Sequence, residues 1–155
     1  MSNLADLITA NAVFESVAVP TKKALLQQLG LMAADMYGLD GRDVTMRLTA
    51  REKLGSTGFG GGAAIPHARL PGLDAVRGVV VRLAATIDFG AIDGLPVDLV
   101  FMLISPVDAG TDHLKALARV SRCLRDAGLV AKLRGAGSRD ALYALLVQDD
   151  ARDAA

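Results

Sequence analysis

Two nearly continuous apolar segments constrain the fold of this chain more than any other feature of its sequence. Residues 78–86 and 97–104 are rich in valine, leucine and isoleucine, and a turn centred on Asp93-Gly94 joins them. Strands of this composition are usually buried on both faces of their sheet, whereas a half-exposed strand alternates apolar and polar residues. The two segments therefore predict a central sheet that other elements cover on both sides.

Helical patterns before these strands provide part of that cover. Apolar residues recur at helical spacing from Thr21, a typical N-cap residue, to Gly38, a typical helix stop. A second helix is predicted to begin at Asp40 or Asp43 and to end near Leu54. A short strand is also predicted within residues 13–19.

Helices after the strands complete the predicted fold. Thr111 or Asp112 is expected to cap one helix and Ser138 another. The apolar stripe of the first is expected to contain Leu114, Leu117, Ser121 and Leu124. The order of elements predicts an α/β fold, a single-domain sandwich with a central mixed β-sheet flanked by helices on both faces. Residues 1–148 are expected to form the domain and residues 149–155 a short polar tail.

The overall composition excludes several classes of function. The 17 basic residues balance the 17 acidic ones, which disfavours nucleic acid and anionic membrane surfaces as partners. Cys123 is the single cysteine, so an internal disulfide is excluded, and its place in a helical pattern predicts a packed side chain. With no apparent export signal or membrane-spanning run, the sequence predicts a cytoplasmic protein without membrane insertion.

The segment from Arg51 to His67 contains the strongest indication of chemistry. Five glycines lead into one of only two histidines, and backbone this free of side chains can approach an anion closely. Pro66 fixes its own φ angle and restricts Ile65 to extended geometry, so that the loop delivers His67 at a defined place. An imidazole is a nucleophile near neutral pH, and Arg51 is a permanent cation. We therefore expect His67 to carry a phosphoryl group.

Nucleotide binding fits this segment less well. The run from Gly58 to Ala63 matches the dinucleotide-binding fingerprint, but that motif needs a strand before it and a helix after it. Here a predicted helix precedes the run and Pro66 follows it. The sequence also does not match the phosphate-binding loop of nucleotide hydrolases, because Gly61 stands where that motif requires a lysine.

Metal and hydrolase sites are also disfavoured. His67 and His113 are far apart in the sequence, and neither has a cysteine or a Glu-x-x-His pattern beside it. A triad of Ser56, His67 and an aspartate would lack the nucleophile elbow that such sites need. We expect no metal and no cofactor.

Four ordered stretches resemble the enzyme IIA components of the bacterial phosphotransferase system, of the fructose/mannitol type and its nitrogen-related branch. These stretches span almost the whole chain in order: Arg51 to Gly58, Ala64 to His67, Asp93 to Phe101, and Pro106 with His113-Leu114. Such a resemblance implies that His67 accepts a phosphoryl group, on its tele nitrogen, from a phosphohistidine of an HPr-like or NPr-like carrier. It also implies that Arg51 and His113 line the same pocket.

Transfer between two nitrogens mostly needs positioning and donors for the phosphoryl oxygens. Arg51, the amides around Thr57 and Gly58, and a neutral His113 are the expected donors. His113 is predicted in the first turn of a helix, where the helix dipole disfavours a protonated imidazole.

Some residues depart from the usual family pattern. Gly61 stands where many relatives have a polar or acidic side chain, Ala63 where a β-branched residue is common, and Ala68 where glycine is frequent. Phe59 replaces an aliphatic residue and is a candidate for a docking surface. The change at Gly61 is expected to remove a contact to the site.

The nitrogen-related branch implies a regulatory protein whose two phosphorylation states bind different targets, of the kinase or transporter type. The first alternative is a sugar-specific enzyme IIA that passes its phosphate to a permease IIB domain. The second is a binding module that no longer transfers phosphate.

Overall fold

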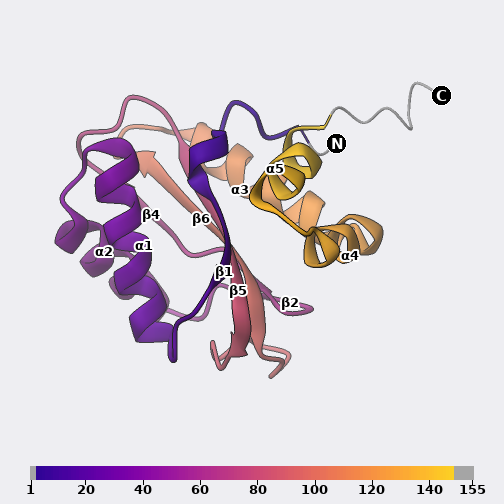
Figure 1. The fold of residues 1–155 in the computed structure, drawn as a ribbon. Helices are drawn as coiled ribbons and strands as arrows, with labels where there is room; N and C mark the ends of the chain where they lie inside the picture. Colours follow the sequence, from indigo (N-terminus) through magenta and orange to yellow (C-terminus); the bar gives the residue numbers. More distant parts are fainter. Residues whose placement is uncertain (1–2, 149–155) are drawn as a thin grey trace.

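The computed structural model describes residues 3–148, and the tail predicted for residues 149–155 lies outside this range. A six-stranded mixed sheet forms the centre of the molecule (Figure 1). Its strands are β1 (Val13–Val17), β2 (Gly58–Gly60), β3 (Ala63–Ala64), β4 (His67–Leu70), β5 (Arg77–Ile87) and β6 (Val97–Pro106). The strand order is β1-β5-β6-β3-β2, and β4 also pairs with β6.

The pairing of β6 determines where the glycine-rich segment lies. One side of β6 pairs antiparallel with β5, as expected for a hairpin. Its other side pairs parallel with the short strands β3 and β4 in turn, and His67 lies opposite Leu103. The segment predicted as a loop is thus partly recruited into the sheet, and this fixes the position of His67.

Helices cover both faces of the sheet, which confirms the predicted fold class. The helices α1 (Lys22–Tyr37) and α2 (Gly41–Lys53) pack on one face, and α3 (Thr111–Arg125), α4 (Ala127–Gly135) and α5 (Arg139–Val147) pack on the other (Figure 1). Along β5 and β6 successive side chains alternate between the two resulting cores. Val79, Val81, Val100 and Met102 belong to the α1–α2 core, whereas Val80, Leu99, Phe101 and Leu103 belong to the other.

Local capping explains the boundaries of the first two helices. The hydroxyl of Thr21 accepts a hydrogen bond from the amide of Ala24, and Gly38 ends α1 with a φ of 68°, in the left-handed region. Asp40, rather than Asp43, is the N-cap of α2. Ser138 caps α5 as predicted, through the amide of Ala141.

The helix α3 differs from its prediction in two respects. Its N-cap position is Gly110, with no side-chain cap. Its buried face contains His113, Ala116, Val120, Cys123 and Leu124. Leu114 is 62% exposed, so the predicted stripe was wrong at its first residue, whereas Leu124 is buried as predicted and Leu117 packs against the core. The prediction placed Leu114 on the buried face, where the first turn instead buries His113.

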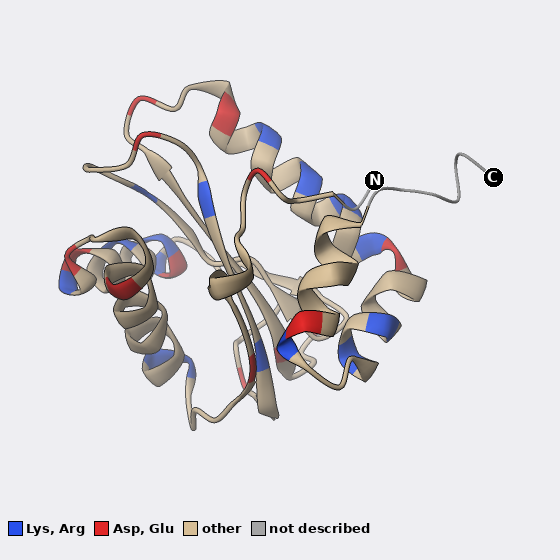
Figure 2. Cartoon of the chain, turned by 45° about the horizontal axis from the view of Figure 1, so that its top comes forward, with Lys and Arg blue, Asp and Glu red and all other residues tan. Residues whose placement is uncertain are grey.

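Charged residues of both signs are distributed over the helices (Figure 2). The helix α3 has an acidic residue in its first turn and basic residues in its last. Within residues 3–148 no helix has the length and apolar character needed to cross a membrane.

Candidate functional site

Three elements bring the predicted site residues together. Arg51 lies in the last turn of α2, His67 is the first residue of β4, and His113 lies in the first turn of α3. Because β4 runs parallel to the end of β6 that leads into α3, His67 comes close to His113. The centroids of the two rings are 5.5 Å apart, with an angle of 57° between the ring planes.

A surface pocket of about 540 Å³ surrounds these groups. Two imidazoles and three guanidinium groups contribute to it, together with small or apolar side chains. Its lining residues are Arg47, Ala50, Arg51, Leu54, His67, Ala68, Arg69 and His113. A pocket with this lining is suited to an anion.

Hydrogen bonding determines which tautomer the neutral His67 ring adopts. Its Nδ1 atom lies 2.7 Å from the carbonyl oxygen of Ile65. A carbonyl oxygen only accepts hydrogen bonds, so Nδ1 must carry the proton and donate it. In the neutral ring Nε2 then has the free lone pair and is the nucleophilic nitrogen.

Electrostatics keep His67 neutral in the physiological range. Burial lowers the pKa of His67 below its ordinary value, and the nearby Arg51 cation acts in the same direction. The Ile65 carbonyl and the Glu52 carboxylate oppose this shift by favouring the charged ring. The net decrease leaves the nucleophilic form available at neutral pH.

His113 is more deeply buried than a first-turn position would suggest. Its side chain is 7% exposed, and its Nδ1 lies 2.6 Å from the hydroxyl oxygen of Ser105. Burial, assisted by the positive charge of Arg69 and by His67, lowers the pKa of His113 to about 4. A neutral ring at this position agrees with the predicted state.

The arginines of the pocket have only partial partners. Arg51 Nη1 donates to the Gly55 carbonyl oxygen at 2.9 Å. Arg47 pairs with Asp43 at 3.0 Å, and Arg69 Nη2 lies at 3.5 Å from the Gly110 carbonyl oxygen. Each therefore has donors to spare for a ligand.

Sequence reasoning missed Arg47 and Arg69, although simple spacing could have indicated both. Arg47 precedes Arg51 by one helical turn, so the two share a helix face. Arg69 follows His67 by two residues in a strand, so both side chains lie on the same face of the sheet.

Thr57 and Gly58 do not line the pocket. The Thr57 amide donates to Glu52 Oε1 at 3.0 Å, and the Thr57 hydroxyl donates to the other carboxylate oxygen. The Gly58 amide donates to the Ser56 hydroxyl at 3.0 Å. Both amides are therefore engaged in holding the loop.

Comparison with known proteins agrees with this geometry. A family model described as "Phosphoenolpyruvate-dependent sugar phosphotransferase system, EIIA 2" matches residues 6–149. The chain belongs to this family.

Relatives of this EIIA chain include proteins with two kinds of name. A "Nitrogen regulatory protein" of Bradyrhizobium diazoefficiens is 46% identical over 143 residues, which cover 92% of this chain and 94% of the relative. A "PTS system fructose-specific EIIA component" of Haloferax volcanii is 34% identical over 129 residues, with 83% and 84% coverage.

A solved structure also resembles this chain closely. The crystal structure of the nitrogen regulatory protein IIA-Ntr from Neisseria meningitidis matches it with a TM-score of 0.87 at 33% identity. The match covers 92% of this chain and 98% of the other. The resemblance predicted from the four sequence stretches is thereby confirmed.

The departures of this EIIA chain from the family pattern lie in different places. Ala68 lines the pocket, but Gly61 and Ala63 line a separate hollow beside α4. The Gly61 amide donates to Asp93 Oδ2 at 2.9 Å, and its carbonyl oxygen accepts from Arg134 Nη2 at 2.6 Å. A contact from position 61 to the His67 pocket is therefore not supported by this geometry.

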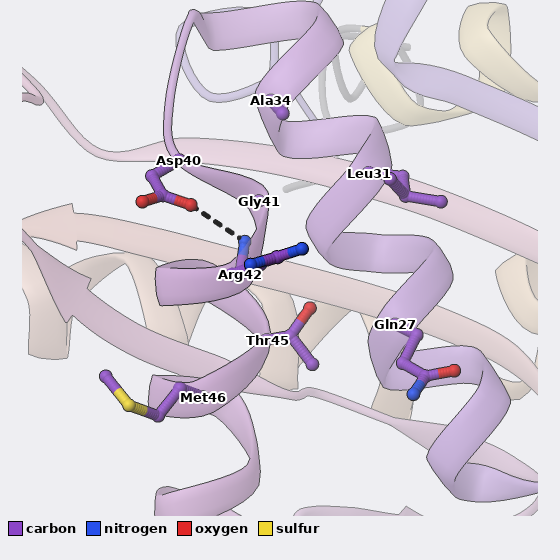
Figure 3. Close-up of a pocket in the computed structure, with 8 residues that line it drawn as sticks. All are labelled: Gln27, Leu31, Ala34, Asp40, Gly41, Arg42, Thr45 and Met46. Carbon is purple, nitrogen blue, oxygen red and sulfur yellow. Dashed lines mark hydrogen bonds between the residues drawn. The ribbon is translucent and has the colours of Figure 1, made fainter.

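A larger cavity of about 650 Å³ lies between α1 and α2 (Figure 3). Its polar groups serve the helices: Asp40 Oδ1 accepts from the Arg42 amide at 3.0 Å, and the Thr45 hydroxyl donates to the Leu26 carbonyl oxygen at 3.4 Å. No histidine contributes to its lining. The smaller pocket around His67 is therefore the better candidate for chemistry.

Proposed function

We propose that this member of the EIIA family is a phosphoryl carrier that accepts a phosphoryl group on Nε2 of His67. The donor is a phosphohistidine of an HPr-type or NPr-type carrier protein. The observation that carries the proposal is the hydrogen bond from His67 Nδ1 to the Ile65 carbonyl, which leaves Nε2 as the nucleophile beside a cationic pocket. A cytoplasmic location follows from such a donor.

The transfer balances without an external acid or base. The Nε2 lone pair forms the new nitrogen–phosphorus bond, while the bond in the donor breaks and leaves its electron pair on the donor ring. The His67 ring, which keeps its Nδ1 proton, gains positive charge during the step. The Ile65 carbonyl, as an acceptor from Nδ1, stabilises that charge.

The pocket supplies charge for the phosphoryl oxygens. Arg51 is the main charge stabiliser, and Arg69 provides a second guanidinium group on the same face as His67. His113, held neutral, donates one hydrogen bond. Thr57 and Gly58 contribute by shaping the loop, since their amides are occupied.

The output of the carrier is regulatory. A phosphoryl group brings nearly two negative charges to a pocket with three arginines, so the two forms present different surfaces to target proteins of the kinase or transporter type. The name and 46% identity of the Bradyrhizobium relative favour this role. The fructose-specific relative supports the alternative, in which the phosphate passes to a permease IIB domain.

Intact-mass analysis after mixing with each phospho-carrier tests the proposal. Wild-type protein is expected to gain one phosphoryl group, and His67→Ala none. The matched control is His113→Gln, which is expected to gain the same mass more slowly. Equal labelling of wild type and His67→Ala would refute the mechanism, and no labelling of wild type by either carrier would favour the non-transferring binding module.

A further inference from the structure

Among the described residues, one buried polar side chain has no role in the mechanism above. Ser105, near the end of β6, is 0% exposed, and its hydroxyl oxygen lies 2.6 Å from His113 Nδ1. Leu103, two residues earlier in the strand, belongs to the core under α3, so Ser105 also faces α3. The hydroxyl is therefore directed at the inner nitrogen of the His113 ring.

Which of the two groups donates this hydrogen bond follows from the need of the buried Ser105 hydroxyl for an acceptor. If Nδ1 carried the proton and donated it, the buried Ser105 hydroxyl would need another acceptor. The contact with His113 is the hydrogen bond found for this hydroxyl among the described residues. A buried donor without an acceptor is costly. The hydroxyl therefore donates, Nδ1 accepts, and the proton of the neutral ring lies on Nε2.

We propose that Ser105 is a positioning residue that holds His113 in its Nε2–H tautomer, so that His113 can donate a hydrogen bond to the phosphoryl group on His67. The proposal rests on the proposed function. His113 needs this help because a neutral imidazole has a single N–H group. The opposite tautomer would present a lone pair to the phosphoryl oxygens, which is repulsive.

The two histidines then have opposite tautomers for complementary reasons. The Ile65 carbonyl, an obligatory acceptor, keeps the proton of His67 on Nδ1 and leaves Nε2 free to attack. Ser105, as a donor, keeps the proton of His113 on Nε2. The low pKa of His113, about 4, means that the ring stays neutral and that the tautomer matters at physiological pH.

Nitrogen-15 NMR of the histidine side chains tests the tautomer directly. Wild-type protein is expected to show a protonated Nε2 and an unprotonated, hydrogen-bonded Nδ1 for His113, and the reverse pattern for His67. In Ser105→Ala the His113 signals are expected to move toward a mixture of tautomers. A protonated Nδ1 on His113 in the wild type would overturn the proposal.

Labelling rates with a phospho-carrier separate positioning from packing. Ser105→Ala is expected to slow labelling of His67 about fivefold, the size of one net hydrogen bond. Ser105→Thr keeps the hydroxyl group, and Ser105→Cys keeps the size of the side chain and a weak donor. At least one of these variants should label His67 at close to the wild-type rate. In a His113→Gln background Ser105→Ala should have no further effect.

A wild-type rate in Ser105→Ala would overturn the proposal, and so would equal losses in all three Ser105 variants, which would indicate packing alone. Failure of the proposed function is distinguishable: wild-type protein would then accept no phosphoryl group, while the NMR spectra would still report the His113 tautomer.

Discussion

Two neighbouring residues of α2, Arg51 and Glu52, belong to regions that use charge in opposite ways. The Glu52 side chain is 5% exposed and its carboxylate is fully paired: it pairs with Lys22 at 2.8 Å and accepts from the amide and hydroxyl of Thr57. We call these three residues the Glu52 anchor. Arg51, in the His67 pocket, has one backbone carbonyl as its partner within the described structure.

These two arrangements show how a glycine-rich segment can be both rigid and open to a ligand. In the Glu52 anchor the protein satisfies its own charges, which stabilises the loop. In the pocket Arg51 and Arg69 have no carboxylate partner among the described residues, which favours an anion at a cost in stability. Changes in the Glu52 anchor should therefore affect mainly the free energy of unfolding, and changes in the pocket should affect mainly the rate of phosphoryl transfer to His67.

The largest effect is expected from breaking the anchor. Glu52→Ala removes the carboxylate partner of Lys22 and of the Thr57 amide, and we expect the free energy of unfolding to decrease by about 3 kcal/mol. Denaturant titration measures this. The control is Asp43→Ala, which removes the carboxylate that pairs with Arg47. Asp43 is more exposed than Glu52, so the free energy of unfolding should decrease by only about 0.5 kcal/mol. Equal losses in the two variants would contradict the role of the anchor.

Removing the Arg51 cation should slow transfer strongly and change stability little. Arg51→Ala is expected to slow labelling of His67 about a hundredfold, as the loss of a main charge stabiliser does in other sites. The free energy of unfolding should change by less than about 1 kcal/mol, because this side chain is not buried. Stopped-flow or quenched labelling gives the rate. An unfolded Arg51→Ala protein would show that the two regions are not separate.

The free energy of unfolding should also depend on pH, because the pocket histidines resist protonation in the folded protein. The unfolded chain protonates His113 near pH 6.5, whereas the pKa of about 4 in the fold delays protonation. Between these values the unfolded state binds more protons, so the free energy of unfolding falls as the pH falls, by up to about 1.4 kcal/mol per pH unit. Burial of His67 contributes with the same sign.

Denaturant titrations from about pH 7 to about pH 5 compare wild type with His113→Gln, which cannot titrate. The free energy of unfolding of His113→Gln should fall less steeply with decreasing pH than that of the wild type. An equal pH dependence in the two proteins would mean that folding does not lower the pKa of His113.

The smallest effect is expected at Gly61, which lies outside both regions. Gly61 has a φ of 65°, so Gly61→Ala should destabilise the fold by about 1 kcal/mol through backbone strain. Labelling of His67 should proceed at the wild-type rate in both Gly61→Ala and Gly61→Asp, since position 61 contacts Asp93 and Arg134. A faster or slower transfer in Gly61→Asp alone would restore a role for this position in the site.

The sequence was sufficient for the architecture because the decisive signals were local. The apolar runs in β5 and β6 predicted a sheet covered on both faces, and Thr21 and Gly38 marked the ends of α1. The full buried face of α3 was not accessible in this way. Ala116 and Cys123 are buried while Leu114 is exposed, because shape decides this contact more than hydrophobicity.

The site was only partly predictable for a related reason. His67, His113 and Arg51 were proposed together from spacing and resemblance, and the structure places them around one pocket. Arg69 could have been found from its spacing to His67, whereas Ser105 comes beside β4 only through the parallel pairing of β4 with β6, which no local pattern indicates. The Thr57 and Gly58 amides were expected to be free because their acceptors, the Glu52 carboxylate and the Ser56 hydroxyl, were not foreseen.

The covering of the sheet by two separate helix layers has a consequence for how a modification would be sensed. Arg51 comes from the α1–α2 layer and His113 from the layer that contains α3, and the two meet beside β4, which within the described sheet pairs with β6 alone. A phosphate bound between them would act as a cross-link from one layer to the other. Hydrogen exchange would then slow at the end of α2 and at the start of α3 together, so that a single covalent event is transmitted to both sides of the molecule.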